Sequence, residues 1–281
     1  MAGNGWMIVS GAIATARRGV RAACGTNHVE RCRQAGQDST GRAARMAMWV
    51  RSLMETLAAD ITGEMRLGRS LILAPHQDDE LLGCGGMIAT KARLGAYVAI
   101  AFLTDGRLGV AAEPAVAQAI RDEEAALAAA ALGLAGDRLA FLGFEDGRLS
   151  EHIEPAAERV RGLIADLGID TLFAPYHREF HPDHAAGWRI GDACRRDGMR
   201  FYEYPIWFGR WLRGWIQRMA APHLQRSMHT VKVNVVDVND AKARARAAYR
   251  SQAFVFERRP GWGPRFPANM YEDYELLLAR E

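Results

Sequence analysis

The chain has 281 residues, of which 49% are hydrophobic and 25% charged, so it is long enough to bury one sizeable core. Its net charge of +3 is too small to indicate a nucleic-acid partner, and no apolar stretch reaches the roughly 18 residues of a transmembrane helix. The four cysteines have no Cys-x-x-Cys spacing, which argues against a disulfide framework and favours a reducing cytoplasm.

Residues 1–48 differ in character from the rest of the chain. Gly, Ala and Arg dominate this stretch, and its first apolar patch lacks the preceding basic residues of a secretory signal. We predict a basic extension that is disordered or precedes the true start at Met46, Met48 or Met54; an interfacial segment is the alternative. Residues 49–281 then form one folded domain.

The first folded elements lead into an unusual group of ionisable residues. Residues 49–65 have apolar side chains at helical spacing and predict an amphipathic helix. The short apolar run at 71–74 is typical of a strand buried on both faces. It ends at Pro75 and is followed directly by H-Q-D-D-E. A helix over 81–94 comes next, and three glycines at its start allow close backbone approach.

The H-Q-D-D-E group needs a compensating partner. Clustered carboxylates at the carboxyl end of a buried strand repel one another and are costly to desolvate, and a divalent metal would relieve this cost. His76 and Asp79 are three residues apart and can turn towards one ion, with Asp78 beside it. Taken alone, the pattern is equally typical of a solvated loop or an acidic helix start.

A second group of the same kind follows a later strand. Residues 171–174 form another short apolar run that ends in proline, and Y-H-R-E-F-H-P-D-H comes next. His181 and His184 are three residues apart with Asp183 between them, and Pro182 favours a helix start. Two strand ends that each carry His and Asp residues indicate a three-ligand N/O metal site.

Between the two groups we predict strands at 97–103 and 139–142, a surface helix at 115–133 that exposes Arg121, Glu123 and Glu124, and a helix at 155–167.

The C-terminal third contains a strand at 201–205 and then three tryptophans four residues apart, Trp207, Trp211 and Trp215. Core or subunit-interface packing, a peripheral membrane or lipid-linked substrate contact, and sugar stacking are the three interpretations of this stripe. Alternating residues at 230–238 predict an edge or antiparallel strand. A helix at 241–252 ends in Y-x-S-Q, and residues 271–279 predict a short helix.

The two motifs, A-P-H-Q-D-D-E and H-P-D-H, resemble the LmbE-like/PIG-L family of metal-dependent N-deacetylases. The resemblance covers roughly residues 71–252, including the K-x-x-A…Y-x-S-Q ending of the late helix. The usual first motif is His-Pro-Asp-Asp-Glu. In this chain Gln77 replaces the proline, at a position that is not a metal ligand.

The resemblance implies a complete catalytic set. It implies three metal ligands, which are His76, Asp79 and His184, with zinc as the metal and iron(II) as the alternative. It implies that Asp78 is the general base, that His181 stabilises the tetrahedral intermediate, and that Asp183 orients His181. It also places the loop at 104–109 near the site, with Asp105, Arg107 and the later Asp146 as candidate contacts; a glycine turn and a turn acid are the alternatives.

The strand-then-helix pattern, repeated about four times over residues 71–197, predicts a Rossmann-like three-layer α/β sandwich with a mostly parallel sheet. No G-x-G-x-x-G follows the first strand, so a dinucleotide site lacks its phosphate cradle. Cys84 lies inside the first motif, where a small buried packing residue is favoured over a nucleophile.

The predicted function is hydrolysis of the N-acetyl group of an N-acetylglucosamine-type amino sugar conjugate, either a small molecule or lipid-linked. Alternatives are an amidase for another sugar or thiol conjugate, a non-catalytic sugar or metal binder, and a membrane-associated assembly partner. Retention of Asp78, which a binding site does not need, argues against the binder. The oligomeric state is not predicted by any pattern in the chain.

Overall fold

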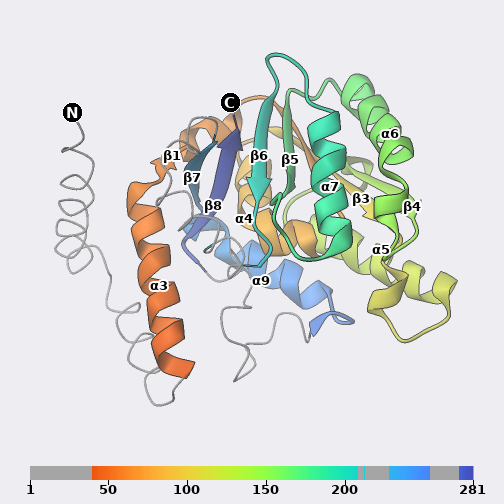
Figure 1. The fold of residues 1–281 in the computed structure, drawn as a ribbon, viewed down its shortest axis with the longest axis horizontal. Coiled ribbons are helices and arrows are strands. Elements are labelled where there is room, and N and C mark those ends of the chain that lie inside the picture. Colours follow the sequence, from red (N-terminus) through yellow and green to blue (C-terminus); the bar gives the residue numbers. More distant parts are fainter. Residues whose placement is uncertain (1–39, 208–211, 213–227, 254–271, 281) are drawn as a thin grey trace, which may run out of the picture.

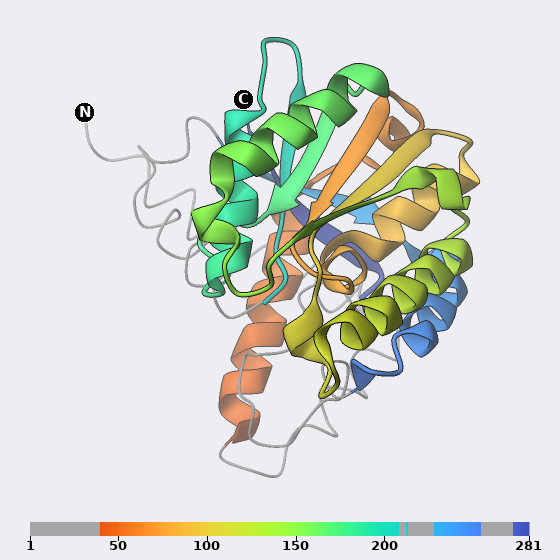
Figure 2. The same cartoon turned by 90° about the vertical axis from the view of Figure 1, so that its right-hand side faces the viewer.

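The computed structural model of the protein describes residues 40–207, 212, 228–253 and 272–280. Within these ranges an eight-stranded sheet lies between two helical layers, with α6 and α7 on one face and α4, α5 and α9 on the other (Figures 1 and 2). The strand order is β1-β7-β8-β6-β5-β2-β3-β4. This arrangement confirms the predicted three-layer α/β fold.

The central part of the chain alternates strands and helices as the sequence predicts. The neighbouring pairs β5–β6, β2–β5, β2–β3 and β3–β4 are all parallel. The strands are β2 (Arg69–Ala74), β3 (Tyr97–Thr104), β4 (Leu139–Phe144), β5 (Thr171–Pro175) and β6 (Arg200–Tyr204). The helices are α4 (Asp79–Arg93), α5 (Pro114–Ala131), α6 (Ile153–Asp166) and α7 (Pro182–Ala193), with short 3-10 turns at Arg107–Gly109, Gly136–Arg138 and Leu149–Glu151.

The first described element is α3 (Thr40–Leu57), which is followed by β1 (Ala59–Asp60) and a 3-10 turn at Thr62–Arg66. The helix begins and ends earlier than the sequence predicts, and its first residues lie inside the predicted extension at 1–48. Residues 1–39 lie outside the described residues, so the domain boundary stays a prediction. The buried side chains of α3 pack against Tyr176 and Leu276 at one side of the sheet.

The C-terminal part completes the sheet with two antiparallel pairings. It consists of β7 (Met228–Asn234), a 3-10 turn at Val236–Val238, α9 (Asn239–Ala248) and β8 (Tyr274–Arg280). Strand β8 lies between β6 and β7 and is antiparallel to both, whereas β7 is parallel to β1 on its other side. The antiparallel alternative is thus confirmed for the pairing with β8, and β7 is not an edge strand. The prediction of a short helix at 271–279 is wrong, because Tyr274–Arg280 form strand β8. The buried run Leu276, Leu277 and Leu278 covers both faces of a strand, and a short apolar run does not distinguish a buried strand from a helix.

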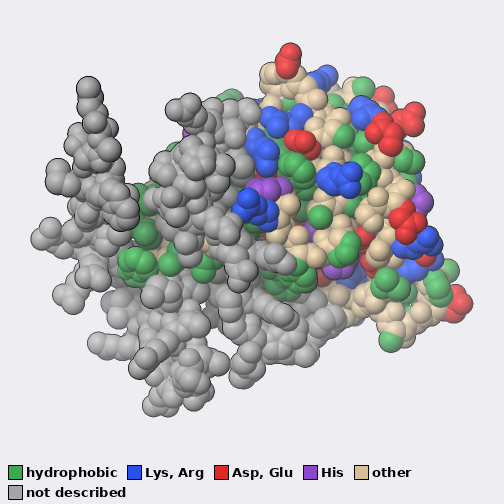
Figure 3. Space-filling view, in the orientation of Figure 1, with side chains coloured by type: hydrophobic (Ala, Val, Ile, Leu, Met, Phe, Trp, Pro, Cys, Tyr) green, Lys and Arg blue, Asp and Glu red, His purple; other side chains and the backbone are tan. Residues whose placement is uncertain are grey.

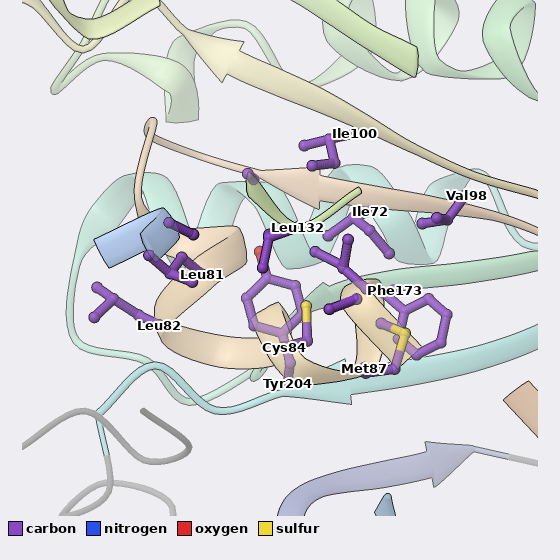
Figure 4. Close-up of a cluster of buried hydrophobic side chains, with 14 of the residues drawn as sticks. Ile72, Leu81, Leu82, Cys84, Met87, Val98, Ile100, Leu132, Phe173 and Tyr204 are labelled. Carbon is purple, nitrogen blue, oxygen red and sulfur yellow. The ribbon is translucent and has the colours of Figure 1, made fainter. Parts of the chain in front are cut away.

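The core consists of one apolar layer on each face of the sheet. Alternate residues of β2 point to opposite layers: Leu71 and Leu73 pack towards α6 and α7, whereas Ile72 packs towards α4 and α5. Figure 4 shows the second layer, in which Cys84 lies among apolar side chains. Cys84 is completely buried in this layer, as expected of a packing residue, and burial raises the pKa of its thiol well above the usual value.

Two glycines let α4 approach the sheet closely. A Cβ on Gly83 would lie 2.1 Å from the Tyr204 ring, and a Cβ on Gly86 would lie 2.6 Å from Val235. The helix is also kinked at Cys84, where φ is −152° and ψ is 27°. The glycines of the first motif therefore serve close packing, as predicted.

A buried lysine in α4 gives a pH-dependent prediction. Lys91 is 1% exposed, and its Nζ donates to the carbonyl groups of Met65 (2.8 Å) and Leu67 (2.9 Å). Burial, with a smaller effect of Arg200, lowers its pKa from 10.5 to about 8. Between these two values the unfolded chain binds more protons than the folded one, so the free energy of unfolding rises with pH in this window.

We therefore expect wild type to gain stability relative to Lys91→Met on going from about pH 7.5 to about pH 10. Urea unfolding of both proteins at the two pH values measures this difference. A difference that stays constant across the window would contradict a lowered pKa of Lys91.

The described helices and the tryptophan stripe both bear on the predicted membrane contact. None of the described helices is both long and apolar enough to cross a membrane. Of the tryptophan stripe, Trp211 and Trp215 lie outside the described residues, while Trp207 is half-buried with its ring 6.1 Å from that of Phe180. The interpretation of the stripe therefore stays open. On the face drawn in Figure 3, acidic and basic side chains are interspersed over the described surface.

Candidate active site

The two motifs meet at the carboxyl ends of neighbouring strands. The chain runs outward from β2 through β3 to β4 and then returns to β5 on the other side of β2. This is a topological switch point, where open α/β sheets bind their ligands. The first motif follows β2 and the second follows β5. The structure thus brings together all six predicted site residues, which are His76, Asp78, Asp79, His181, Asp183 and His184.

Asp79 lies between two imidazole rings. Its Oδ2 is 3.1 Å from Nδ1 of His76 and 3.3 Å from Nε2 of His184. In a tetrahedral zinc site with bonds of about 2.0–2.1 Å, neighbouring donor atoms are roughly 3.3 Å apart, so both distances fit. Burial alone would raise the pKa of Asp79, but His184 and His76 hold it well below its usual value. An ionised carboxylate and two imidazoles form a donor set suited to zinc.

His76 is held from its other side by two carboxylates. Its Nε2 is 3.2 Å from Oδ1 of Asp146 and 3.2 Å from Oδ2 of Asp183. These acceptors favour a proton on Nε2, which leaves the Nδ1 lone pair facing Asp79. Asp146 therefore lies in the site, as the resemblance implied, and its other oxygen accepts the backbone N–H of Leu108 at 2.9 Å.

Among the described residues, two sets of three have donor atoms that all lie within 4.8 Å of one another, and the predicted set is not one of them. One set is His76, His181 and His184, and the other is His76, Asp146 and Asp183. His76 is common to both sets and to the predicted one. The ligand set His76, Asp79 and His184 therefore stays a prediction, which single-residue variants can test.

Asp78 adopts a conformation that its neighbours must enforce. Its φ of 145° makes it the one non-glycine residue with positive φ among the residues described. Its N–H donates to Oε2 of Glu80 at 3.1 Å, and its Oδ1 is 3.3 Å from Nη2 of Arg121. Burial raises the pKa of the Asp78 carboxyl to about 6, although Arg121 opposes the change.

Arg121 was missed by sequence reasoning. The expectation of a surface helix with solvated charges is wrong for Arg121 and Glu124, which are 2% and 8% exposed. Arg121 Nε and Nη1 are buried and have no hydrogen-bond partner among the described residues. The R-x-x-E spacing places both residues on one face of α5, but only the fold shows that this face is turned inward.

Gln77 stands where the usual motif has proline, and its side-chain amide makes hydrogen bonds that a proline side chain cannot make. Its amide Nε2 donates to Oδ1 of Asp122 at 2.8 Å and to the carbonyl of Thr104 at 3.3 Å. The motif loop is thereby tied to α5 and to the end of β3.

His181 is half-buried and lies against both histidines of the predicted ligand set. Its ring centroid is 4.8 Å from that of His76 and 4.9 Å from that of His184. Its Nδ1 accepts the backbone N–H of Asp183 at 3.2 Å, at the start of α7. Burial lowers its pKa, and the two neighbouring histidines lower it further.

The described contacts of the Asp183 carboxylate are to backbone groups and to His76, and not to the His181 ring that it is predicted to orient. It accepts the backbone N–H groups of Gly147 (2.7 Å) and Leu149 (3.1 Å) and faces His76. The expected orientation of His181 by Asp183 stays a prediction, and the described contacts indicate an effect on His76 as well.

Asp105 and Arg107 pair with each other within their loop, at 2.7 Å from Arg107 Nε to Asp105 Oδ2.

The contact with His76 predicts that Asp183→Asn weakens metal binding. We expect a loss of affinity of about 10–100-fold, because the carboxylate that orients a metal-binding imidazole is removed. Chelator competition measures the change. His181→Ala is the matched control and is expected to keep its metal. If Asp183 acts only through His181, Asp183→Asn will instead retain full affinity and lose turnover alone.

Comparison with known proteins places the chain in a family. The sequence model of the PIG-L family, described as GlcNAc-PI de-N-acetylase, matches residues 71–194. A probable N-acetyl-alpha-D-glucosaminyl L-malate deacetylase 2 of Bacillus cereus is 32% identical over 195 residues, which cover 65% of this chain and 82% of that protein. The chain belongs to the PIG-L family. The match to this relative confirms the resemblance seen in the motifs.

Other relatives and solved structures are similar over part of their length. The 2'-N-acetylparomamine deacetylase of Streptomyces fradiae is 34% identical over 141 residues, which are 43% of this chain and 50% of that protein. A conserved protein of Thermus thermophilus is 29% identical with a TM-score of 0.50, over 67% of this chain and 81% of its own. The N,N'-diacetylchitobiose deacetylase of Pyrococcus horikoshii is 21% identical with a TM-score of 0.54, over 73% of this chain and 78% of its own. This likeness shows a shared fold.

Proposed function

We propose that this PIG-L protein is a metal-dependent hydrolase that removes the N-acetyl group from an N-acetylglucosamine-type amino sugar conjugate. The observation that carries the proposal is the position of the Asp79 carboxylate between His76 and His184. The neighbouring Asp78 carboxylate pairs with Arg121 and not with these two histidines. The names of two relatives, which describe deacetylases of N-acetylated sugar compounds, support the substrate class.

The donor set fits a zinc ion held by His76, Asp79 and His184, with iron(II) as the alternative. When bound there, the metal supplies Lewis-acid polarisation of the amide carbonyl and acidification of water. The Nε2 of His184 is the nitrogen directed at Asp79, and its Nδ1 is buried without a hydrogen-bond partner among the described residues.

Asp78 is proposed as the general base. Its carboxylate is held by Arg121 and its backbone by Glu80, so it is positioned beside the ligands without being one of them. It takes a proton from the attacking water as the water oxygen bonds to the amide carbon. A positioned base of this kind contributes about 10²–10⁴-fold to the rate.

His181 is proposed to act on the developing charge. Its ring lies against His76 and His184 at the edge of the cluster and is only half-buried, so a substrate can reach it. In its protonated form it donates to the carbonyl oxygen as that oxygen becomes negative. It then gives its proton to the amine as the C–N bond breaks. The loss of one such donor costs about 10²–10³-fold in rate.

Acetate release from a panel of N-acetylglucosaminyl compounds, together with the metal content of the purified protein, tests this function. The panel includes a malate, an inositol, a thiol-linked and a lipid-linked conjugate. One metal per chain and acetate release from at least one member would support the proposal. Bound metal without acetate from any member would favour another amide or a binding role, and a protein that binds no metal would overturn the proposal.

A further inference from the structure

The Y-x-S-Q motif after α9 has no part in the proposed chemistry, yet it reaches the site from a distant part of the chain. Tyr249 is completely buried, and its hydroxyl donates to Oε1 of Glu80 at 2.6 Å. The second oxygen of Glu80 accepts the N–H of Asp78 at 3.1 Å. A chain of two hydrogen bonds thus runs from Tyr249 through Glu80 to the backbone of the proposed base.

The backbone of Asp78 depends on such contacts. A φ of 145° is rarely adopted by a residue with a side chain, and it persists only where the surroundings over-determine it. The carbonyl of Asp78 accepts the N–H groups of Leu81 (3.0 Å) and Leu82 (2.9 Å). Its N–H has Glu80 as its partner. Glu80 has two oxygens, and Tyr249 fixes the one that does not bind Asp78.

Ser251 holds a second part of the same site. Its backbone N–H and its hydroxyl donate to the two carboxylate oxygens of Glu124, at 2.8 and 2.6 Å. Glu124 lies one turn along α5 from Arg121, which pairs with Asp78. Ser251 therefore fixes the helix face that presents Arg121.

Gln252 holds a third part. Its amide donates to the carbonyl of Gly109 at 2.9 Å and to Ser251 Oγ at 3.0 Å. Gly109 belongs to the loop in which Leu108 donates its N–H to Asp146, beside His76. Three residues of one short segment thus contact α4, α5 and the turn at Arg107–Gly109, each of which carries a residue of the site or a contact to one.

We propose that residues 249–252 form a clasp that positions the general base, with Tyr249 holding the strained backbone of Asp78 through Glu80. The proposal rests on the proposed function, in which Asp78 takes the proton from water. Tyr249 is a positioning residue, since its hydroxyl acts on Asp78 through the carboxylate of Glu80.

A buried tyrosine can also matter for stability alone, and the chain offers a matched control. Tyr204 is completely buried too, and its hydroxyl donates to the carbonyl of Leu73 at 2.6 Å, inside β2. Tyr204→Phe and Tyr249→Phe each remove one buried hydroxyl, together with the hydrogen bond described for it. They differ in whether the acceptor leads to Asp78.

The test compares turnover, KM and metal content of the two variants with wild type in the acetate-release assay. Tyr249→Phe is expected to lower kcat by about 10–100-fold, with KM and metal content within about twofold of wild type, because a small displacement of a catalytic group is costly. Tyr204→Phe is expected to keep kcat within about threefold of wild type. Equal turnover in the two variants would overturn the clasp.

Hydrogen exchange by mass spectrometry tests the clasp without relying on activity. The amides in a peptide spanning residues 76–83 are expected to exchange faster in Tyr249→Phe and at the wild-type rate in Tyr204→Phe. If wild type releases no acetate, the proposed function fails, and this exchange difference still decides the structural link. Equal exchange rates in both variants would reject the link.

Discussion

Asp78→Asn is expected to lose acetate release by about 10²–10⁴-fold while it keeps its metal and its fold. Asparagine has nearly the same size as aspartate and tolerates positive φ better than most residues, so it can occupy the strained position. It cannot take a proton from water. Steady-state turnover, metal analysis and thermal unfolding of the same preparation separate these three properties.

Asp170→Asn is the matched control for this variant. Like Asp78, Asp170 pairs with an arginine, Arg200, but it lies at the opposite end of the strands, where its carboxylate accepts the backbone N–H of Arg69. We expect it to retain wild-type turnover. Asp78→Asn with near-normal activity would reject the assignment of the base, and loss of metal from that variant would instead make Asp78 a ligand.

His76→Ala is expected to abolish stoichiometric metal binding and, with it, acetate release. His76 belongs to the predicted ligand set and to both sets of close donor atoms among the described residues, so each of these three sets needs it. Metal analysis after dialysis against a weak chelator measures the loss. Stoichiometric metal in this variant would overturn the metal centre as a whole.

Further single variants then identify the ligand set. If His76, Asp79 and His184 bind the metal, Asp79→Asn and His184→Ala lose it, while Asp146→Asn and His181→Ala retain it at reduced or unchanged affinity. A set built from His76, His181 and His184 predicts loss of metal in His181→Ala and retention in Asp79→Asn. These two sets therefore differ in their pattern of loss, which is read from metal content alone.

The position of the site was predictable because it depends on local patterns. Short apolar runs ending at Pro75 and Pro175 mark buried strands, and the carboxyl ends of parallel strands lie at one edge of a sheet. The His and Asp residues that follow them had to meet there. The same logic identified the glycine-rich start of α4, where a Cβ on Gly83 would meet the Tyr204 ring.

The contacts that shape the site were not predictable, because they join residues far apart in sequence. Arg121 looks like an ordinary surface arginine until α5 is seen to face Asp78, and the partner of Glu124 is Ser251. Strand β8 was misassigned because its three consecutive leucines are compatible with a helix and with a strand buried on both faces. Only its pairing with β6 and β7 decides between them.

The place of β8 has a consequence for the order in which the protein is assembled during synthesis. Strands β2 to β6 and both metal-binding motifs are made first, and they can form a parallel sheet from contacts among themselves. Strands β1 and β7 pair with each other but reach that sheet only through β8, the last of the described strands to leave the ribosome. A nascent chain that stops before β8 therefore carries every proposed ligand but holds an incomplete sheet. The pair β1–β7 and the parallel strands β2 to β6 are joined only when β8, the last described strand, is made.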